Sequence, residues 1–194
     1  MPDLSSTYEI LTGPAKIYFA AIGETFPDID DSAVTGFTSL GETDGGVSIT
    51  FEQTTEEVRV DQRTGPVKVT RSEEGIVITT NLVVASLENL ATLMQTSVTE
   101  VSAGSGVPGT KTIGMYRGGD VTERAFTISG ESAYGAYPSQ YELPRGYISG
   151  NMEMAHTKDG VTVLPVEIHV LEDLSASSTD ERFGRLVHQT AAAT

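Results

Sequence analysis

Residues 47–56 alternate between apolar and polar side chains, and no other feature of the chain limits its possible folds so strongly. Val47, Ile49 and Phe51 alternate with the polar or charged residues Ser48, Thr50, Glu52, Thr54 and Glu56. A period of two predicts a β-strand that turns one face toward a core and the other toward water. We therefore expect an antiparallel sheet in which Val47, Ile49 and Phe51 are buried.

The neighbouring segments extend this pattern into a sheet of several strands. The apolar parity shifts at Val58 and Val60, which predicts a β-bulge there, before a loop at residues 61–66. A return strand is expected to open at Val67, and Glu73, Glu74 and Gly75 suggest a further turn. Other strands are predicted at residues 15–20, 76–84, 125–130, 148–156 and 161–171, with an Asp-Gly hairpin turn at 158–160.

One segment has the period of a helix instead. Its apolar residues recur at helical spacing, at Leu87, Leu90, Ala91, Leu93 and Met94. Ser86 stands where an N-cap is expected, and Glu88 in the first turn favours the helix dipole. We predict a helix over residues 86–94 that packs its apolar stripe against the sheet.

The length of 194 residues fits a single domain. We expect it to cover residues 1–194, with an N-terminal segment at about 1–12 and a polar C-terminal arm at about 175–194. The stretch 23–46 is long, polar and aperiodic, which is typical of a functional or interface loop. Val, Thr, Ser, Ile and Gly outnumber the strong helix formers, so the fold class is mainly β: an antiparallel β-sandwich or barrel with one flanking α-helix and long loops.

The charge of the chain restricts its partners. With 27 acidic and 12 basic residues the net charge is −15, which repels nucleic acid rather than binding it. The chain has no cysteine, so neither disulfides nor thiolate metal sites are available. It also has no apolar run of membrane-spanning length, and its first residues lack the basic start and apolar stretch of a signal peptide.

No arrangement of reactive residues predicts an enzyme, a metal site or a cofactor. The three histidines, His156, His169 and His188, lack the spacing of metal ligands. The acidic run at 28–31 lacks the glycine and the final glutamate of a calcium loop, so a solvated loop is the better interpretation. Adjacent carboxylates such as Glu56 and Glu57 point to opposite faces of a strand and do not converge on a substrate.

The order of several motifs resembles the tail tube proteins of long-tailed bacteriophages. The chain reads LGETDGGVSI at 40–49, VDQRTGPV at 60–67, LVVASLENL at 82–90 and LPVEI at 164–168, followed by LED at 171–173. The resemblance extends over about three quarters of the chain and rests on this order and spacing. The stretch 98–124 and the last twenty residues resemble nothing that we can name.

The resemblance implies a structural virion protein without catalytic activity. In this family six subunits form a ring, the rings stack, and one sheet of each subunit joins a continuous barrel around a lumen. The same broad fold occurs in contractile-tail tubes and in the tube protein of type VI secretion. The expected partners are further copies of the chain, a tape measure protein inside the tube, and tail terminator and tail tip proteins. DNA would pass without specific binding, no membrane would be involved, and the protein, made in the host bacterial cytoplasm, would end in the virion tail.

The resemblance and the strand pattern together predict two sets of functional residues. The polar sides of two alternating strands would face the lumen, at Ser48, Thr50, Glu52, Thr54, Glu56, Asn151 and Glu153. The tip of the hairpin that outruns its own sheet has unpaired backbone groups, which need a partner in the adjacent ring. The residues expected at this contact are Glu57, Arg59, Asp61, Gln62, Arg63 and Pro66.

An alternative from another functional class is a non-catalytic β-sandwich that binds a ligand or decorates a capsid. It predicts a monomer or small oligomer whose loops form a binding surface. The absence of tryptophan and the low aromatic content speak against such a surface.

Overall fold

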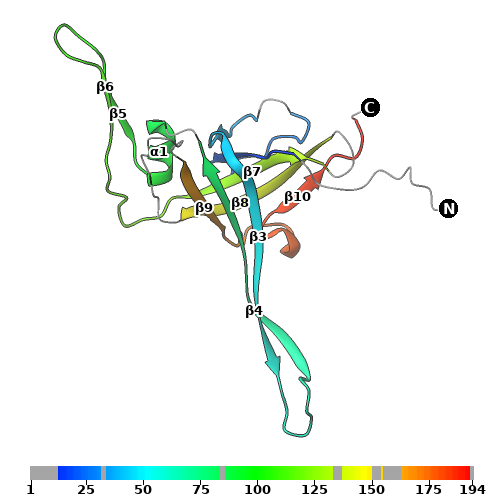
Figure 1. Ribbon diagram of the computed structural model, residues 1–194. Coiled ribbons are helices and arrows are strands. Elements are labelled where there is room, and N and C mark those ends of the chain that lie inside the picture. Colours follow the sequence, from blue (N-terminus) through cyan, green and yellow to red (C-terminus); the bar gives the residue numbers. More distant parts are fainter. Residues whose placement is uncertain are drawn as a thin grey trace.

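The computed structural model describes residues 13–31, 34–83, 86–132, 137–149, 154 and 163–192, and it is mainly β as expected (Figure 1). The strands are β1 (Lys16–Ala20), β2 (Thr38–Ser39), β3 (Thr43–Val58), β4 (Lys68–Leu82), β5 (Val98–Val101), β6 (Thr110–Ile113), β7 (Glu123–Glu131), β8 (Pro138–Ser149), β9 (Leu164–Val170) and β10 (Arg185–His188). Within these residues one α-helix, α1 (Leu87–Met94), and one 3-10 turn (Thr179–Glu181) accompany the strands.

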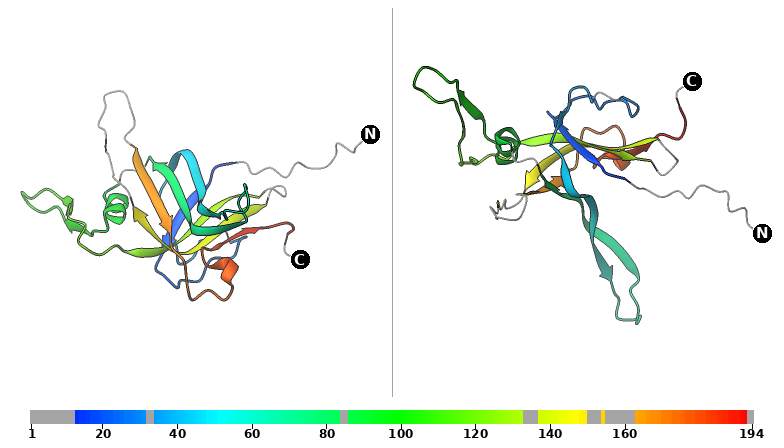
Figure 2. Two further views of the ribbon diagram at one scale, coloured as in Figure 1. Left: turned by 90° about the horizontal axis from the view of Figure 1, so that it is seen from below. Right: turned by 45° about the horizontal axis from the view of Figure 1, so that its top comes forward.

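A single antiparallel sheet forms the body of the molecule. Its strand order is β2-β1-β7-β8-β9-β4-β3, and β10 pairs with β8 outside this path. Strand β8 links the two halves, because its first half pairs with β10 and its second half with β9. The sheet curls so that side chains of β1, β4, β7, β8 and β9 enter one apolar core (Figure 2). Strands β5 and β6 form a separate two-stranded sheet.

A row of four isoleucines crosses the core side of the sheet. Ile49 pairs with Ile78, Ile78 with Ile168, and Ile168 with Ile148, so the four side chains stand next to one another on β3, β4, β9 and β8. Ile78 and Ile168 are fully buried. Such cross-strand neighbours bury apolar area and fix the register, since a slip by one residue would turn the whole row toward water.

The predicted alternation is confirmed for Val47 and Ile49, which pack against the core, but it is wrong for Phe51. The Phe51 side chain is 70% exposed because β3 has left the body of the molecule at this point. The predicted turn at 73–75 is also wrong, since β4 runs without interruption through these residues and pairs with β3. The irregularity expected at Val58 lies instead where the pairing shifts between Thr54 and Thr55.

The predicted helix is confirmed, with a correction to the face that it buries. Ser86 caps α1, because its hydroxyl oxygen accepts a hydrogen bond of 3.1 Å from the Asn89 backbone N–H. Leu93 enters the main core and is only 2% exposed, and Ala91 is buried beside it. Leu90, expected at the centre of the buried stripe, is only half-buried.

The loop between β1 and β3 covers the outer side of the sheet. Phe26 stacks on Phe37 with ring centroids 5.5 Å apart, and Phe37 packs against Ala20 and Ala125 in a second, smaller cluster. The Gln140 side-chain amide donates a hydrogen bond of 2.9 Å to the Pro27 carbonyl. Part of the predicted interface loop is therefore fixed to the fold.

The C-terminal segment differs from the predicted arm, because strand β10 builds it into the sheet. The Arg185 guanidinium donates a hydrogen bond of 2.6 Å to the buried carboxylate of Glu142, which raises the pKa of Arg185. Gly184 approaches the Glu142 backbone at a φ of 111°, where any side chain would collide with that backbone. The predicted N-terminal segment 1–12 and the hairpin turn 158–160 lie outside the described residues.

The packing of α1 predicts a difference between two leucine substitutions. Leu93→Ala should lower the free energy of unfolding by about 2–5 kcal/mol, because it empties a buried site. Leu90→Ala should cost clearly less, because the Leu90 side chain is already partly in water. Denaturant unfolding of both variants measures the difference, and an equal loss for the two would contradict this packing.

Candidate functional site

The side of β3, β4, β9 and β8 that points away from the core is polar, and we call it the polar face. Directly beside the isoleucine row runs a polar row in which Ser48 pairs with Thr79, Thr79 with Glu167, and Glu167 with Ser149. The next row contains Thr50, Val77, His169, Tyr147 and Glu123. The alternation of β3 is thus repeated across four strands.

Acidic groups outnumber basic ones on this face. By strand parity and pairing it carries Asp44, Glu52, Glu123 and Glu167, against the guanidinium of Arg145. Arg145 is not free, because its Nε lies 2.6 Å from a Glu123 carboxylate oxygen, and this hydrogen bond raises the pKa of Arg145.

The histidine of the polar face is held between two neighbours. The Nε2 of His169 lies 2.6 Å from a Glu167 carboxylate oxygen. The imidazole ring stacks on the ring of Tyr147, with the ring centroids 5.4 Å apart. These contacts fix the side chain of His169 within the wall of the sheet. They leave the face polar, and a cavity of about 500 Å³ lies on it, lined by residues that include Ser48, Thr79 and Glu167.

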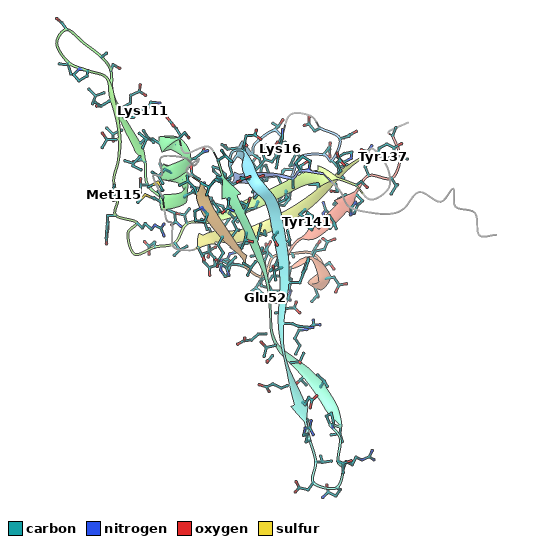
Figure 3. The ribbon with its side chains drawn as sticks, viewed as in Figure 1. Lys16, Glu52, Lys111, Met115, Tyr137 and Tyr141 are labelled. Atoms are coloured by element: carbon teal, nitrogen blue, oxygen red, sulfur yellow. The ribbon has the colours of Figure 1, made fainter. Side chains whose placement is uncertain are left out.

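The structure brings together the predicted lumen residues of β3. Ser48 and Thr50 lie on the polar face, opposite the core residues Val47 and Ile49. Glu52 stands where β3 leaves the body, as Figure 3 shows, and Thr54 and Glu56 follow on the same side of the strand farther out. Asn151 and Glu153 lie outside the described residues.

Strands β3 and β4 continue past the body as a long hairpin, which we define as residues 51–75. It extends away from the body in Figure 1 and in the right view of Figure 2. All residues from 51 to 74 are exposed, so neither face of this ribbon is covered by the described part of the chain. The predicted contact residues all lie in its outer part and are all exposed: Glu57, Arg59, Asp61, Gln62, Arg63 and Pro66.

The tip of the long hairpin, residues 57–69, differs chemically from the rest of the chain. It carries three basic and two acidic residues, whereas the whole chain has a net charge of −15. Arg59 pairs with Glu57 at 2.7 Å, but Arg63 and Lys68 make no ion pair with the described residues. Four exposed valines accompany these charges, at positions Val58, Val60, Val67 and Val69.

A second projection was missed by the sequence reasoning. We define the arm as residues 98–122, which contain β5, β6 and the segment that leads back to β7; it leaves the body on the side of α1 (Figure 1). Met115 and Tyr116 on this arm are 83% and 86% exposed. A pair of large apolar side chains within a glycine-rich segment, between Gly114 and Gly118, was the available signal.

Neither a metal site nor a membrane-spanning helix is found among the described residues. No group of three or more histidine or carboxylate side chains among them is arranged to hold a metal ion. None of their helices is long and apolar enough to cross a membrane.

These features define a mainly β protein that presents a polar face and two exposed projections. The chain matches the sequence profile of the phage tail tube protein family over residues 4–180, and it belongs to this family. It is therefore a structural component of a phage tail. The family match supports this role over the alternative of an isolated binding module. A comparison with curated protein sequences finds no match.

Two solved structures resemble the chain at low sequence identity. One is a chain of the anti-feeding prophage baseplate, with 11% identity, a TM-score of 0.42, and coverage of 92% of this chain and 95% of that chain. The other is the Hcp protein, with 12% identity, a TM-score of 0.35, and coverage of 92% and 100%. Because both TM-scores are below 0.5, the family assignment rests on the sequence match alone.

Proposed function

We propose that the protein polymerises as stacked hexameric rings into the phage tail tube, the conduit through which DNA is ejected. The observation that carries this proposal is the long hairpin of a tail tube family member, exposed on both faces from residue 51 to 74. A ribbon of this length gains its cover from another subunit. The tape measure protein inside the tube and the terminator and tip proteins at its ends complete the set of proposed partners.

Closure of the ring uses the edge of the sheet. Strand β3 ends the described strand order, so one side of its backbone carries donors and acceptors that no described strand pairs. An exposed edge of this length is an aggregation hazard, and pairing it with a neighbouring subunit removes the hazard. Joined in this way, the four strands of the polar face become part of one continuous barrel. We infer that the polar face lines its lumen.

The charge of the polar face suits the passage of DNA. Carboxylates at Asp44, Glu52 and Glu167 would repel phosphates within about 10 Å at moderate salt, which is the screening length. Repulsion lowers the attraction of the wall for the backbone, so DNA moves without binding. The predicted lumen residues Asn151 and Glu153 remain candidates for the same wall.

Stacking of the rings uses the tip of the long hairpin. Its valines provide apolar area, and its basic residues, Arg63 and Lys68 among them, are attracted to the acidic surface of the next subunit. This contact would use the predicted residues Glu57, Arg59, Asp61, Gln62, Arg63 and Pro66.

Deletion of Asp61 to Thr64 tests the stacking contact. The shortened chain should fold, because every deleted residue is exposed, but it should no longer form tubes. Thermal unfolding of the monomer and electron microscopy of concentrated protein measure the two properties. Thr64→Ala serves as the control and should still polymerise. Normal tubes from the deletion variant would rule out this role of the tip.

Reversal of charge on the polar face tests the passage of DNA. Particles carrying Asp44→Lys and Glu52→Lys should assemble but eject DNA more slowly, because the wall then attracts phosphates. The defect should shrink as salt is raised, since salt screens the attraction. Asp28→Lys with Asp30→Lys, on the loop between β1 and β2, makes the same charge change elsewhere and serves as the control. Ejection at the normal rate and with no salt dependence would contradict an electrostatic role of these residues.

A further inference from the structure

The arm, residues 98–122, is attached to the body at its base. The Nζ of Lys111 lies 2.7 Å from a carboxylate oxygen of Glu88 on α1, and the Thr122 backbone N–H donates a hydrogen bond of 2.8 Å to the Gln95 side chain. Beyond these contacts the arm leads away from the body, and Figure 3 shows Lys111 and Met115 on this projection. It leaves the body in a different direction from the long hairpin (Figures 1 and 2).

The arm lacks a core of its own. Only Val98 and Ile113 are half-buried, and all other residues from 98 to 122 are exposed. A two-stranded ribbon is marginally stable in water unless a further surface covers one of its faces. The exposed residues nevertheless include five large apolar side chains, at Val101, Val107, Met115, Tyr116 and Val121. This amount of apolar surface on a thin projection indicates a covered interface.

The charge of the arm identifies the kind of partner. It contains two acidic residues, Glu100 and Asp120, and two basic residues, Lys111 and Arg117, so the net charge of −15 belongs to the rest of the chain. Two copies of such a chain repel each other, and a neutral segment approaches a second copy at the least electrostatic cost. A nucleic acid partner would need an excess of basic residues, which the arm lacks.

We propose that the arm docks on a second copy of this chain and buries Met115 and Tyr116 there. This contact is separate from the stacking contact of the long hairpin, and it rests on the proposed function only in requiring self-association. The contact is heterologous, because the arm of one subunit covers a different surface of the next. Heterologous contacts propagate into rings or filaments instead of ending at a dimer.

Thiol labelling tests the proposal, because the natural chain has no cysteine and any introduced thiol is the sole target. Tyr116→Cys is compared with Asp30→Cys, an exposed residue on the loop between β1 and β2. In the monomer a maleimide should modify both at similar rates. In the assembled state Tyr116→Cys should react at least about ten-fold more slowly, because the reagent reaches the thiol only when the interface opens, while Asp30→Cys keeps its rate.

The outcomes separate this proposal from the proposed function. Tubes in which Tyr116→Cys reacts as fast as in the monomer would overturn the docking of the arm and leave the tube intact. Protection in oligomers that never form tubes would support the arm and overturn the stacked-ring proposal. If Tyr116→Cys is protected only after another tail protein is added, the arm docks on that protein, and the proposal of a second copy is overturned. A chain that stays monomeric at every concentration would overturn both proposals.

A second variant tests the proposal in case the Tyr116→Cys substitution itself prevents assembly. Met115→Asp with Tyr116→Asp should leave the unfolding midpoint of the monomer unchanged, because both side chains are exposed there. The concentration needed for assembly should rise at least about ten-fold, since two acidic groups then enter the interface of a chain that is already acidic. Unchanged assembly of this folded variant would refute the proposal, and so would a matching rise for the control, Ile22→Asp with Thr25→Asp, which adds the same two charges on the exposed loop between β1 and β2.

Discussion

The pairing of β3 with β4, β9 and β8 is the constraint on which the remaining structure depends. Its isoleucine row, Ile49, Ile78, Ile168 and Ile148, fixes the register, and that register places the polar row of Ser48, Thr79, Glu167 and Ser149 on the opposite face. The same pairing starts the long hairpin, because β3 and β4 continue to pair with each other after the core has ended. Core, polar face and projection are therefore three consequences of one strand alignment.

Copies of a chain with a net charge of −15 repel one another, and this repulsion opposes the proposed polymerisation. The arm and the tip of the long hairpin carry none of that negative charge: the arm is neutral, and the tip, residues 57–69, has one more basic than acidic residue. The negative net charge instead comes from the remaining residues, which include those of the polar face. In the proposed tube, this distribution would let copies meet through the arm and the tip while the wall that would face DNA remains repulsive.

The sequence was sufficient for features that depend on local periodicity. The alternation at Val47 and Ile49 and the cap at Ser86 are properties of a few neighbouring residues, and both were predicted. Phe51 was misplaced because an extended strand can leave the core without any change in its own pattern. Strand β10 was missed because it depends on the contact of Arg185 with Glu142, which is 43 residues away in the sequence. The arm was missed because its apolar residues have no periodicity.

The exposed strands of the long hairpin could also pair unspecifically with other strand edges. The long hairpin places charged residues between its exposed valines, with Glu57, Arg59 and Asp61 around Val58 and Val60. Charges along an exposed strand oppose unspecific edge-to-edge pairing, because a register that brings like charges opposite each other is destabilised. The register that matches opposite charges is favoured over these alternatives. In the proposed tube, the charged residues of the long hairpin would therefore also select how the next subunit binds.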